Sequence, residues 1–550
     1  MSQPRLLLVG IDGAAPALLE RWMESGELPA FARLRESGAF GPLQSVPNMM
    51  SPAAWTTIAT GVNPGKHGIF CFLDRVPGTY RLRRPNATCR AAPAFWRLTS
   101  EAGLRTCVLN MPMSYPAEAV NGLQVAGWLT PSPQSEGFTH PPELAPELAA
   151  RFGEYPLHSD IQRFVARGHL ARARERILGN LRKKGEIAEE LLARERWDVM
   201  AVAFVEIDPA QHYFWHLTDP SHPEHDVALR ERVGDVVLAV YQEMDRILGR
   251  LVDRLDDLTH VMIVSDHGAG PNCRGALYLP ELFEQLGWQK RRGELRYRAA
   301  RRLLRIAESR LPAPFKHRFA ARLARLGGMD GLWELMTGDI SWRDTRAYSF
   351  LCGGSAEPWI NLRGREPEGT VEPGEEYRAL CEEVREVLMT ATDPGSGRPV
   401  IAEVLHREEV YHGPHLARAP DMLIRWREDC EALSGLRCGE ARVDRTAAEH
   451  YQTGAHRPEG VLLVCGEGIR AGSIATAQAQ DIAPNLLHLC GLRVPGYADG
   501  RVLTELLAEE RARAVLVDEQ AELGVREGRE IGDEAEEAAV VERLRGLGYL

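Results

Sequence analysis

The chain has 550 residues, of which 44% are hydrophobic and 26% charged, and its 66 basic against 77 acidic side chains give a net charge of −11. This composition is that of a soluble globular protein, and it excludes disordered and collagen-like chains. The mild acidity argues against a dedicated nucleic-acid-binding protein. At roughly 150 residues per domain, the length allows three or four units, or one large core with insertions.

Apolar runs are short throughout the sequence. Arg, Glu or Pro interrupts each of them before the ~20 residues that a membrane-spanning helix needs, so we expect no transmembrane segment. Residues 5–12 are too short for the apolar part of a signal peptide and continue into an Asp-Gly turn. The ten cysteines include no C-x-x-C pair, which excludes zinc ribbons and thioredoxin-type motifs. We therefore expect a cytoplasmic protein with reduced cysteines.

Short β-rich apolar runs alternate with helical stretches along the chain. This pattern is typical of strands that are buried on both faces of a parallel sheet, and it predicts an α/β core with a mostly parallel central sheet flanked by helices. Apolar residues at three- and four-residue spacing predict crossover helices at 16–37 and 233–255. The predicted strands are residues 6–11, 106–111, 199–207, 261–264, 422–426 and 461–465.

Residues 131–193 and 288–345 are interpreted as helical cap insertions into a core that spans residues 1–507. Within the second insertion, residues 290–325 carry thirteen Lys or Arg and two Glu, a local charge of +11. The plain interpretation is a solvated amphipathic helix, and the alternative is a surface arm that attracts an anionic substrate, lipid or partner. Residues 508–550, which are rich in Glu, are predicted to form a helical, acidic C-terminal appendage.

Acidic residues follow three of the predicted strands. Asp12 follows the first strand, Asp208 follows the strand at 199–207, and Asp266 with His267 follows the strand at 261–264. Because ligands bind outside the carboxyl ends of the strands in an open parallel sheet, these side chains are expected to converge on one crevice. A single Asp in such a loop is commonly only a helix N-cap, but three at three strand ends favour a shared site.

Histidines near these acids indicate a metal site. Pro209 suits the first position of a helix, which makes Asp208 the predicted N-cap and places His212 one turn later, close enough to share a ligand. Mixed Asp and His ligands suit Zn²⁺, Mn²⁺ or Fe better than Ca²⁺. His456, just before the strand at 461–465, is the candidate for a further ligand, and His450 in the same loop is its competitor.

Ser51 is the candidate nucleophile. Ser51 and Pro52 precede a run with helical periodicity, which predicts a helix N-cap, and that structural role alone is sufficient to account for the serine. The free N–H groups and the dipole of a helix N-terminus also bind phosphate and favour an ionised serine oxygen. The same residue can therefore be a cap and a nucleophile.

In chain order, these residues resemble the alkaline phosphatase superfamily, and more closely its type I phosphodiesterase/nucleotide pyrophosphatase branch, which in bacteria includes phosphohydrolase/phosphomutase-like proteins. The resemblance spans residues 5–503 and implies an alkaline-phosphatase-like fold. Its most specific stretches are residues 10–13, 52–61, 63–68, 265–268 and 456–460.

The resemblance also implies two divalent metal ions, with zinc as the expected metal and Mn or Fe as alternatives. Ser51 would attack phosphorus and form a phosphoseryl intermediate that water then hydrolyses. The implied ligand sets are Asp208, His212 and His456 for one ion, and Asp12, Ser51, Asp266 and His267 for the other.

Two positions depart from the pattern of the nucleotide pyrophosphatases. These proteins usually have Thr as the nucleophile and Asn three residues later, whereas this chain has Ser51 and Ala54. This difference weakens the expectation of nucleotide specificity. The sulfatase pattern is absent, because Pro52 directly follows Ser51, and no aligned phosphate-binding Arg is found.

We therefore predict a metal-dependent phosphoric ester hydrolase that cleaves a small phosphodiester or phosphomonoester. The alternatives are a metal-dependent phosphomutase and, in a different class, a non-catalytic protein that binds phosphorylated ligands. The sequence predicts neither the residues that bind the rest of the substrate nor the oligomeric state.

Overall fold

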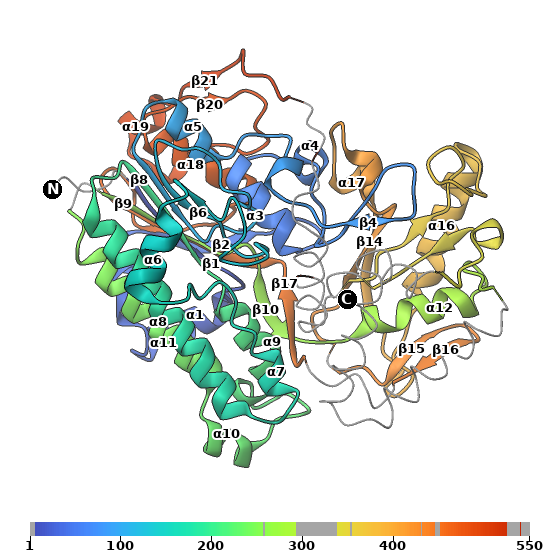
Figure 1. Cartoon of the computed structure of the whole chain (residues 1–550). Coiled ribbons are helices and arrows are strands. Elements are labelled where there is room, and N and C mark those ends of the chain that lie inside the picture. Colours follow the sequence, from blue (N-terminus) through green and yellow to red (C-terminus); the bar gives the residue numbers. More distant parts are fainter. Residues whose placement is uncertain are drawn as a thin grey trace.

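The computed structural model describes residues 6–256, 259–292, 338–351, 355–430, 432–445 and 452–524, together with residues 528 and 540. A nine-stranded sheet lies at the centre of one lobe, the core, and the described residues between 272 and 453 form a second lobe beside it (Figure 1). In the described ranges, no helix is both long and apolar enough to cross a membrane. The nine cysteines in these ranges are all free.

The central sheet has the strand order β19-β2-β18-β9-β1-β8-β5-β6-β7. Strands β9, β1, β8, β5 and β6 run parallel, whereas β18 is antiparallel to both β9 and β2 and β7 is antiparallel to β6. The prediction of a mostly parallel sheet is therefore confirmed. The strands are β1 (Leu6–Ile11), β2 (Ala39–Gln44), β5 (Thr106–Leu109), β6 (Gly122–Val125), β7 (Thr139–His140), β8 (Val199–Phe204), β9 (His260–Val264), β18 (Glu459–Cys465) and β19 (Gly472–Ser473).

Helices cover both faces of the sheet. Successive strand residues point to opposite faces, so Leu7 and Val9 of β1 join one apolar layer, while Leu6 and Leu8 join the other. The helices that contribute to the first layer are α1 (Pro16–Glu24), α2 (Pro29–Ser37), α6 (Leu144–Phe152), α7 (Gln162–Val165), α8 (Leu170–Arg194), α9 (Ile207–Thr218), α10 (Val227–Val233) and α11 (Val236–Val252). Those that contribute to the second are α3 (Ser51–Thr60), α5 (Phe95–Glu101), α18 (Ile482–Leu489) and α19 (Glu509–Arg513).

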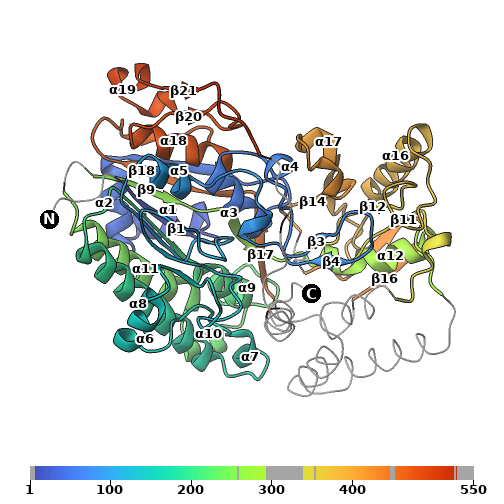
Figure 2. The same cartoon turned by 45° about the horizontal axis from the view of Figure 1, so that its top comes forward.

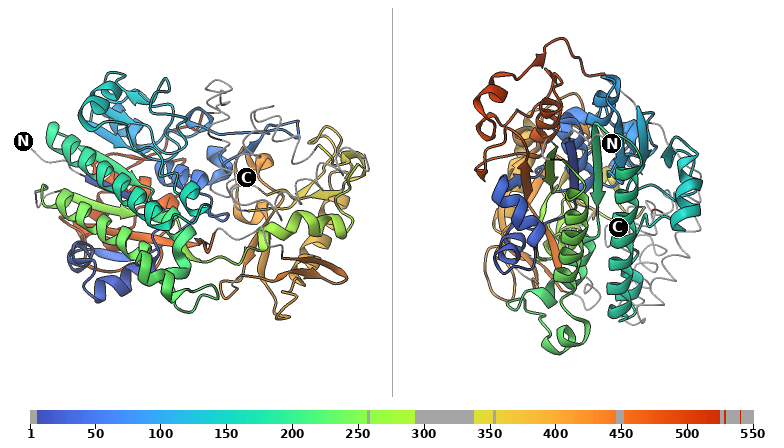
Figure 3. Two further views of the ribbon diagram at one scale, coloured as in Figure 1. Left: turned by 60° about the horizontal axis from the view of Figure 1, so that its bottom comes forward. Right: turned by 90° about the vertical axis from the view of Figure 1, so that its left-hand side faces the viewer.

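Helix α8 lies within the segment that was interpreted as the first insertion. It packs against α11, and the two helices run side by side in Figure 3, teal and green. Ile177, Leu181 and Leu191 of α8 are fully buried in the first apolar layer. This segment therefore supplies part of the layer that covers the sheet. Residues 293–337 of the second predicted insertion lie outside the described residues.

The second lobe has an apolar core of its own, drawn from residues 276–443. The hairpin β3 (Asp74–Arg75) and β4 (Leu82–Arg83) reaches it from the core (Figure 2), and Tyr80 beside that hairpin stacks on Trp342 at 3.7 Å between ring centroids. The elements of the lobe are β11 (Ala347–Tyr348), β12 (Trp359–Ile360), β13 (Ile401–His406), β14 (Met422–Trp426), β15 (Gly435–Cys438), β16 (Ala441–Asp444), α12 (Leu279–Gln285), α16 (Glu375–Met389) and α17 (Arg407–Val410).

Three sequence predictions need correction. The strand at 422–426 exists, as β14, but it pairs only with β13 in the second lobe, so its assignment to the central sheet was wrong. The strand predicted at 199–207 ends at Phe204, because Ile207 already begins α9. The single helix predicted at 16–37 is two helices, α1 and α2, and Pro29 begins the second.

The described residues of the C-terminal segment are helical only in part. Helix α19 is five residues long, and β21 (Val517–Asp518) pairs in parallel with β20 (Val494–Pro495), so described residues of this segment are joined to the core. The remaining elements are α4 (Pro64–His67) and two strands between the lobes, β10 (Gly268–Pro271) and β17 (Gly454–Arg457).

Candidate metal centre and nucleophile

The carboxyl ends of the central strands bring the predicted acidic residues together. Asp12 directly follows β1, Asp266 lies two residues beyond β9, and Asp208 lies in the first turn of α9, just after β8. Strand β1 pairs in parallel with both β8 and β9. The three carboxylates therefore lie at the same edge of the sheet, as expected for a ligand site of an open α/β sheet.

The first group of side chains, the acidic cluster, consists of Asp12, Asp266 and His267. Candidate ligand atoms of these residues lie within 4.8 Å of one another. The Nε2 atom of His267 is 3.6 Å from Asp12 Oδ1 and 3.4 Å from Asp266 Oδ2. All three side chains are buried, with at most 2% of their surface exposed. The acidic cluster is thus closed to bulk water.

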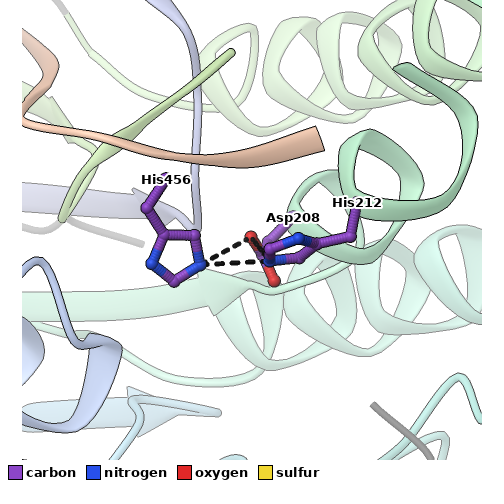
Figure 4. A group of neighbouring side chains, drawn as sticks. All are labelled: Asp208, His212 and His456. Carbon is purple, nitrogen blue, oxygen red and sulfur yellow. Dashed lines mark hydrogen bonds and ion pairs between the residues drawn. The ribbon is translucent and has the colours of Figure 1, made fainter. Parts of the chain in front are cut away.

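The second group, the histidine cluster, consists of Asp208, His212 and His456 (Figure 4). His212 lies one helical turn after Asp208, and its Nε2 is 3.1 Å from Asp208 Oδ1. The Nε2 atom of His456 is 3.5 Å from the same oxygen and 3.1 Å from His212 Nε2. Residues that are 244 positions apart in the chain therefore point their ring nitrogens at one place.

A two-stranded antiparallel ribbon, β10–β17, brings the two clusters side by side. His267 immediately precedes β10 and His456 lies on β17, where it pairs with Ala269. The rings of the two histidines stack at 3.6 Å between centroids with an angle of 21°. Gly454 permits this arrangement, because a Cβ atom there would lie 2.4 Å from the backbone oxygen of Gln211 on α9.

Each histidine is oriented by a backbone carbonyl. Nδ1 of His212 donates to Gly454 O at 2.9 Å, Nδ1 of His267 to Gly268 O at 3.0 Å, and Nδ1 of His456 to Met49 O at 2.8 Å. A carbonyl oxygen can only accept, so the neutral rings carry their proton on Nδ1 and present Nε2 as a lone pair. This is how metal-binding histidines are commonly oriented.

Burial and neighbouring charges shift the pKa of the carboxylates in different directions. Burial, together with Asp266 and Asp208, raises the pKa of Asp12 well above its usual value. Burial raises the pKa of Asp266 as well, and Asp208 adds to the shift. Burial opposes ionisation of Asp208, but His212 and His456 hold its pKa well below the usual value.

The histidine rings respond to the same surroundings. Burial opposes protonation of His212, yet the adjacent Asp208 carboxylate raises its pKa above the usual value. Burial lowers the pKa of His267, and the neighbouring His456 adds to that shift. His267 is therefore neutral at physiological pH, and its Nε2 presents a lone pair.

These residues fit divalent cations. Within the described part of the chain, Asp12 Oδ1 and Asp266 Oδ2 are buried without a hydrogen-bond partner. His212 Nε2 and His456 Nε2, both lone-pair atoms, face each other at 3.1 Å. Buried acceptors that point at one another are costly unless a positive charge lies between them. The donor set of three carboxylates and three imidazoles suits Zn²⁺, Mn²⁺ or Fe.

Ser51 lies against the acidic cluster. It is the first residue of α3, and Met50 occupies the N-cap position, so the predicted N-cap role is wrong by one position. Its side chain is buried, and Oγ lies 3.1 Å from His267 Nε2. A similar shift applies to Asp208, because Glu206 is the N-cap of α9. The serine oxygen is therefore held against the acidic cluster by its contact with His267.

Several residues that support the clusters were not predicted as site residues from the sequence. The indole Nε1 of Trp55 donates to Asp12 Oδ2 at 3.2 Å. Gln211 Nε2 donates to Gly13 O at 2.6 Å, and Tyr241 OH donates to Gln211 Oε1 at 3.0 Å. Tyr241 OH also accepts from the Ala15 N–H at 2.8 Å, so one network joins the loop after β1 to α9. His450, the competitor of His456, lies outside the described residues.

The sequence profile of the type I phosphodiesterase/nucleotide pyrophosphatase family matches residues 6–456. The chain belongs to this family. It is accordingly an enzyme of the phosphoric ester hydrolases, within the alkaline phosphatase superfamily, whose members are metalloenzymes. No curated protein matches it in sequence.

Two solved structures of phosphonoacetate hydrolase share the fold at low sequence identity. Phosphonoacetate hydrolase from Sinorhizobium meliloti 1021 in complex with phosphonoacetate is 17% identical, with a TM-score of 0.54 over 87% of this chain and 94% of the hydrolase. The complex of the same hydrolase with phosphonoformate is 16% identical, with a TM-score of 0.53 over 87% of this chain and 94% of the hydrolase. An inactive murine ectonucleotide pyrophosphatase/phosphodiesterase 5 in complex with AMP is 13% identical, with a TM-score of 0.49 over 92% of this chain and all of that one.

Proposed function

We propose that this family member is a two-metal phosphohydrolase that cleaves a small phosphodiester or phosphomonoester through a phosphoseryl intermediate on Ser51. The observation that carries the proposal is the position of the Ser51 oxygen, 3.1 Å from His267 Nε2, beside two clusters that are suited to cations. A hydroxyl in such surroundings is a suitable nucleophile for phosphoryl transfer.

The two clusters are the proposed ligand sets. Divalent ions held there would lower the pKa of the serine hydroxyl and neutralise charge on the attacking and leaving oxygens. Zinc is the expected metal, and Mn and Fe suit the same donors. One ion is assigned to Asp208, His212 and His456, and the other to Asp12, Ser51, Asp266 and His267.

The residues around Ser51 account for binding and transfer. The N-terminus of the ten-residue helix α3 presents backbone N–H groups and a positive dipole end to the phosphoryl group. Ser51 Oγ gives up its proton and attacks phosphorus, the bond from phosphorus to the ester oxygen breaks, and that oxygen takes up a proton in place of the one lost by the serine and leaves as an alcohol. Water then attacks the phosphoseryl group, which restores the serine hydroxyl and releases the phosphate product.

The proposed substrate is small and phosphorylated, in keeping with the phosphonate and nucleotide ligands that the solved structures contain. Ala54 is buried at the position where the nucleotide pyrophosphatases usually carry Asn. We therefore assign no nucleotide preference. The nine cysteines in the described part of the chain are all free, which agrees with a reducing, cytoplasmic setting.

The test combines metal analysis with a substrate panel. Purified protein should contain close to two equivalents of transition metal, and it should hydrolyse aryl phosphodiesters, aryl phosphomonoesters or sugar phosphates. Ser51→Ala should abolish turnover and leave the metal of the histidine cluster in place, whereas Ser51→Thr, which keeps the hydroxyl, should retain activity. A metal-free, fully folded protein, or equal activity of wild type and Ser51→Ala, would contradict the mechanism.

The same panel separates the alternatives. Transfer of the phosphoryl group to an added sugar in preference to water would indicate a phosphomutase. Tight binding of phosphorylated ligands with no turnover of any ester would indicate a non-catalytic binding protein.

A further inference from the structure

Two segments of the second lobe, one at its start and one near its end, are tied to a single carboxylate of the core. That carboxylate belongs to Glu224, in the loop between α9 and α10. Nη1 and Nη2 of Arg274, which follows β10, donate to Glu224 Oε1 and Oε2 at 3.0 and 2.9 Å. Nη2 of Arg445, which directly follows β16, donates to Glu224 Oε1 at 2.8 Å. These three residues form what we call the interlobe clamp.

The interlobe clamp is largely removed from solvent. The Arg274 side chain is 1% exposed, and those of Arg445 and Glu224 are 24% and 30% exposed. The two parallel hydrogen bonds from Arg274 are the stronger and geometrically more specific form of an ion pair. Hydrogen bonds from Arg274 and then from Arg445 lower the pKa of Glu224 to about 2. At neutral pH, both arginines therefore bind one fixed negative charge.

Hydrogen bonds to the backbone join the interlobe clamp to the start of β17. Arg274 has a φ of 64°, a left-handed conformation that is uncommon outside glycine, and its N–H donates to Asn272 Oδ1 at 2.8 Å. The Asn272 N–H donates to Thr453 O at 2.9 Å. Nη2 of Arg274 also donates to Gln452 O at 3.4 Å. Since Gln452 and Thr453 lead directly into β17, the interlobe clamp holds the beginning of the strand that carries His456.

Helix α9 holds the same stretch of chain from its other side. The Thr453 N–H donates to His212 O at 2.7 Å, and Nδ1 of His212 donates to Gly454 O at 2.9 Å. Asp208 and His212 are neighbours on one helix, so α9 alone sets the distance between them. His456 is the member of the histidine cluster that a different segment supplies (Figure 4). Its position beside Asp208 therefore depends on how β17 is fixed to α9.

We propose that Glu224 is a positioning residue for the histidine cluster. Its carboxylate, through the two arginines of the interlobe clamp, fixes β17 against α9 and so keeps Nε2 of His456 beside Asp208 Oδ1, 3.5 Å away. The proposal rests on the two-metal function proposed above, because His456 completes one of the two ligand sets. Glu224 itself belongs to neither cluster, and it acts through the strand that it holds.

The first experiment measures the Zn²⁺ affinity of metal-free protein by competition with a chromophoric chelator. Wild type should bind two equivalents, and His456→Ala identifies the ion of the histidine cluster by its loss. Glu224→Gln should weaken that ion's binding by about tenfold, the lower value for groups that support metal ligands, and leave the other equivalent unchanged. In the His456→Ala background, the same substitution should have no effect on the remaining ion. Unchanged affinity of the histidine cluster, or an equal loss at both clusters, would overturn the proposal.

Glu189→Gln is the matched control. The Glu189 carboxylate of α8 also holds two arginines, Arg250 of α11 at 2.7 Å and Arg254 just after α11 at 3.5 Å. The substitution removes the same charge from a comparable group within the core, so both zinc affinities should stay those of wild type. Should Glu224→Gln fail to fold, Arg445→Met removes only the more exposed arginine of the interlobe clamp. It should weaken the histidine cluster by a smaller factor, and unchanged affinity in that variant would overturn the proposal.

Hydrogen exchange of the metal-free protein tests the interlobe clamp separately from the proposed function. The amides of residues 453–457 should exchange at least roughly tenfold faster in Glu224→Gln than in wild type or Glu189→Gln, the effect of losing a hydrogen bond to a charged group. Faster exchange confined to this stretch would support the interlobe clamp even if no ester is turned over and the proposed function fails. Unchanged exchange would overturn it even if Ser51-dependent hydrolysis is found.

Discussion

The acidic cluster and the histidine cluster lie side by side, but different parts of the fold build them. Asp12 and Asp266 follow two paired central strands, and their side chains are at most 2% exposed. The histidine cluster combines α9 with the β10–β17 ribbon, and the side chains of Asp208 and His456 are 12% and 8% exposed. The sheet itself therefore determines the first cluster, whereas the second depends on a chain segment that returns from the other lobe.

The clusters also differ in charge. The acidic cluster has two carboxylates and one imidazole, and its carboxylates both have a raised pKa. The histidine cluster has one carboxylate and two imidazoles, and the histidines hold the pKa of Asp208 low. Buried carboxylates gain more from a cation than neutral rings do. We therefore expect the acidic cluster to hold its ion more tightly and to exchange it more slowly.

Among the predictions that compare the two clusters, the largest expected effect is that of Asp266→Asn. The substitution removes one of two charges from the acidic cluster, so activity should fall by at least about a hundredfold, the upper loss found for residues that only support metal ligands. Metal content should drop from two equivalents to one. Asp245→Asn is a matched control, because Asp245 is a buried carboxylate on α11 that caps the start of α2 through the Ala30 and Phe31 N–H groups. Unchanged metal content in Asp266→Asn would contradict the assignment.

Metal removal should proceed in two phases. A chelator is expected to take the ion of the more exposed histidine cluster first and the ion of the closed acidic cluster later, with activity lost in the first phase. The measurement is metal release followed together with residual activity. Asp266→Asn should lack the slow phase and His456→Ala the fast one. If Asp266→Asn instead lacks the fast phase and His456→Ala the slow one, burial does not determine the order in which the two ions are released.

Glu357 is a buried carboxylate that belongs to neither cluster, and its burial should lower the stability of the fold at high pH. Burial raises its pKa from the usual 4.5 to about 7. As the pH rises from 4.5 to 7, the unfolded chain loses this proton before the folded one does, so the folded state loses relative stability. Glu357→Gln should therefore be more stable than wild type at pH 8 by up to about 3 kcal/mol, with little advantage at pH 4.5. Urea unfolding at both pH values checks this, and a difference independent of pH would contradict it.

The smallest expected effect concerns the network that links the two clusters. Tyr241→Phe removes the hydroxyl that joins Gln211 on α9 to the Ala15 N–H, and it should cost about 1 kcal/mol of unfolding free energy and reduce kcat. Tyr278→Phe is the control, because its buried hydroxyl donates to Leu433 O inside the second lobe. It should cost similar stability with kcat unchanged. Equal kcat in both variants would show that the network does not position the clusters.

Much of the core follows from local patterns in the sequence. The strand at 6–11 and the acids after β1, β8 and β9 are recognisable because a parallel strand that is buried on both faces is continuously apolar and ends where the polar site begins. The run at 422–426 has the same apolar character, but apolar character does not specify which sheet a strand joins, so its assignment was wrong. Arg418 and Asp74 belong to no motif. The two side chains form an ion pair only because the two lobes pack together. Neither the composition of the chain nor the spacing of its residues predicts such a contact.

The β10–β17 ribbon has a consequence for how this family can vary. The whole second lobe leaves the core after Pro271 and returns before Gly454, so the ribbon contains both of its covalent connections. All seven residues proposed for catalysis and metal binding lie outside that stretch. The second lobe can therefore be replaced or changed as one unit while the seven proposed catalytic and metal-binding residues are kept.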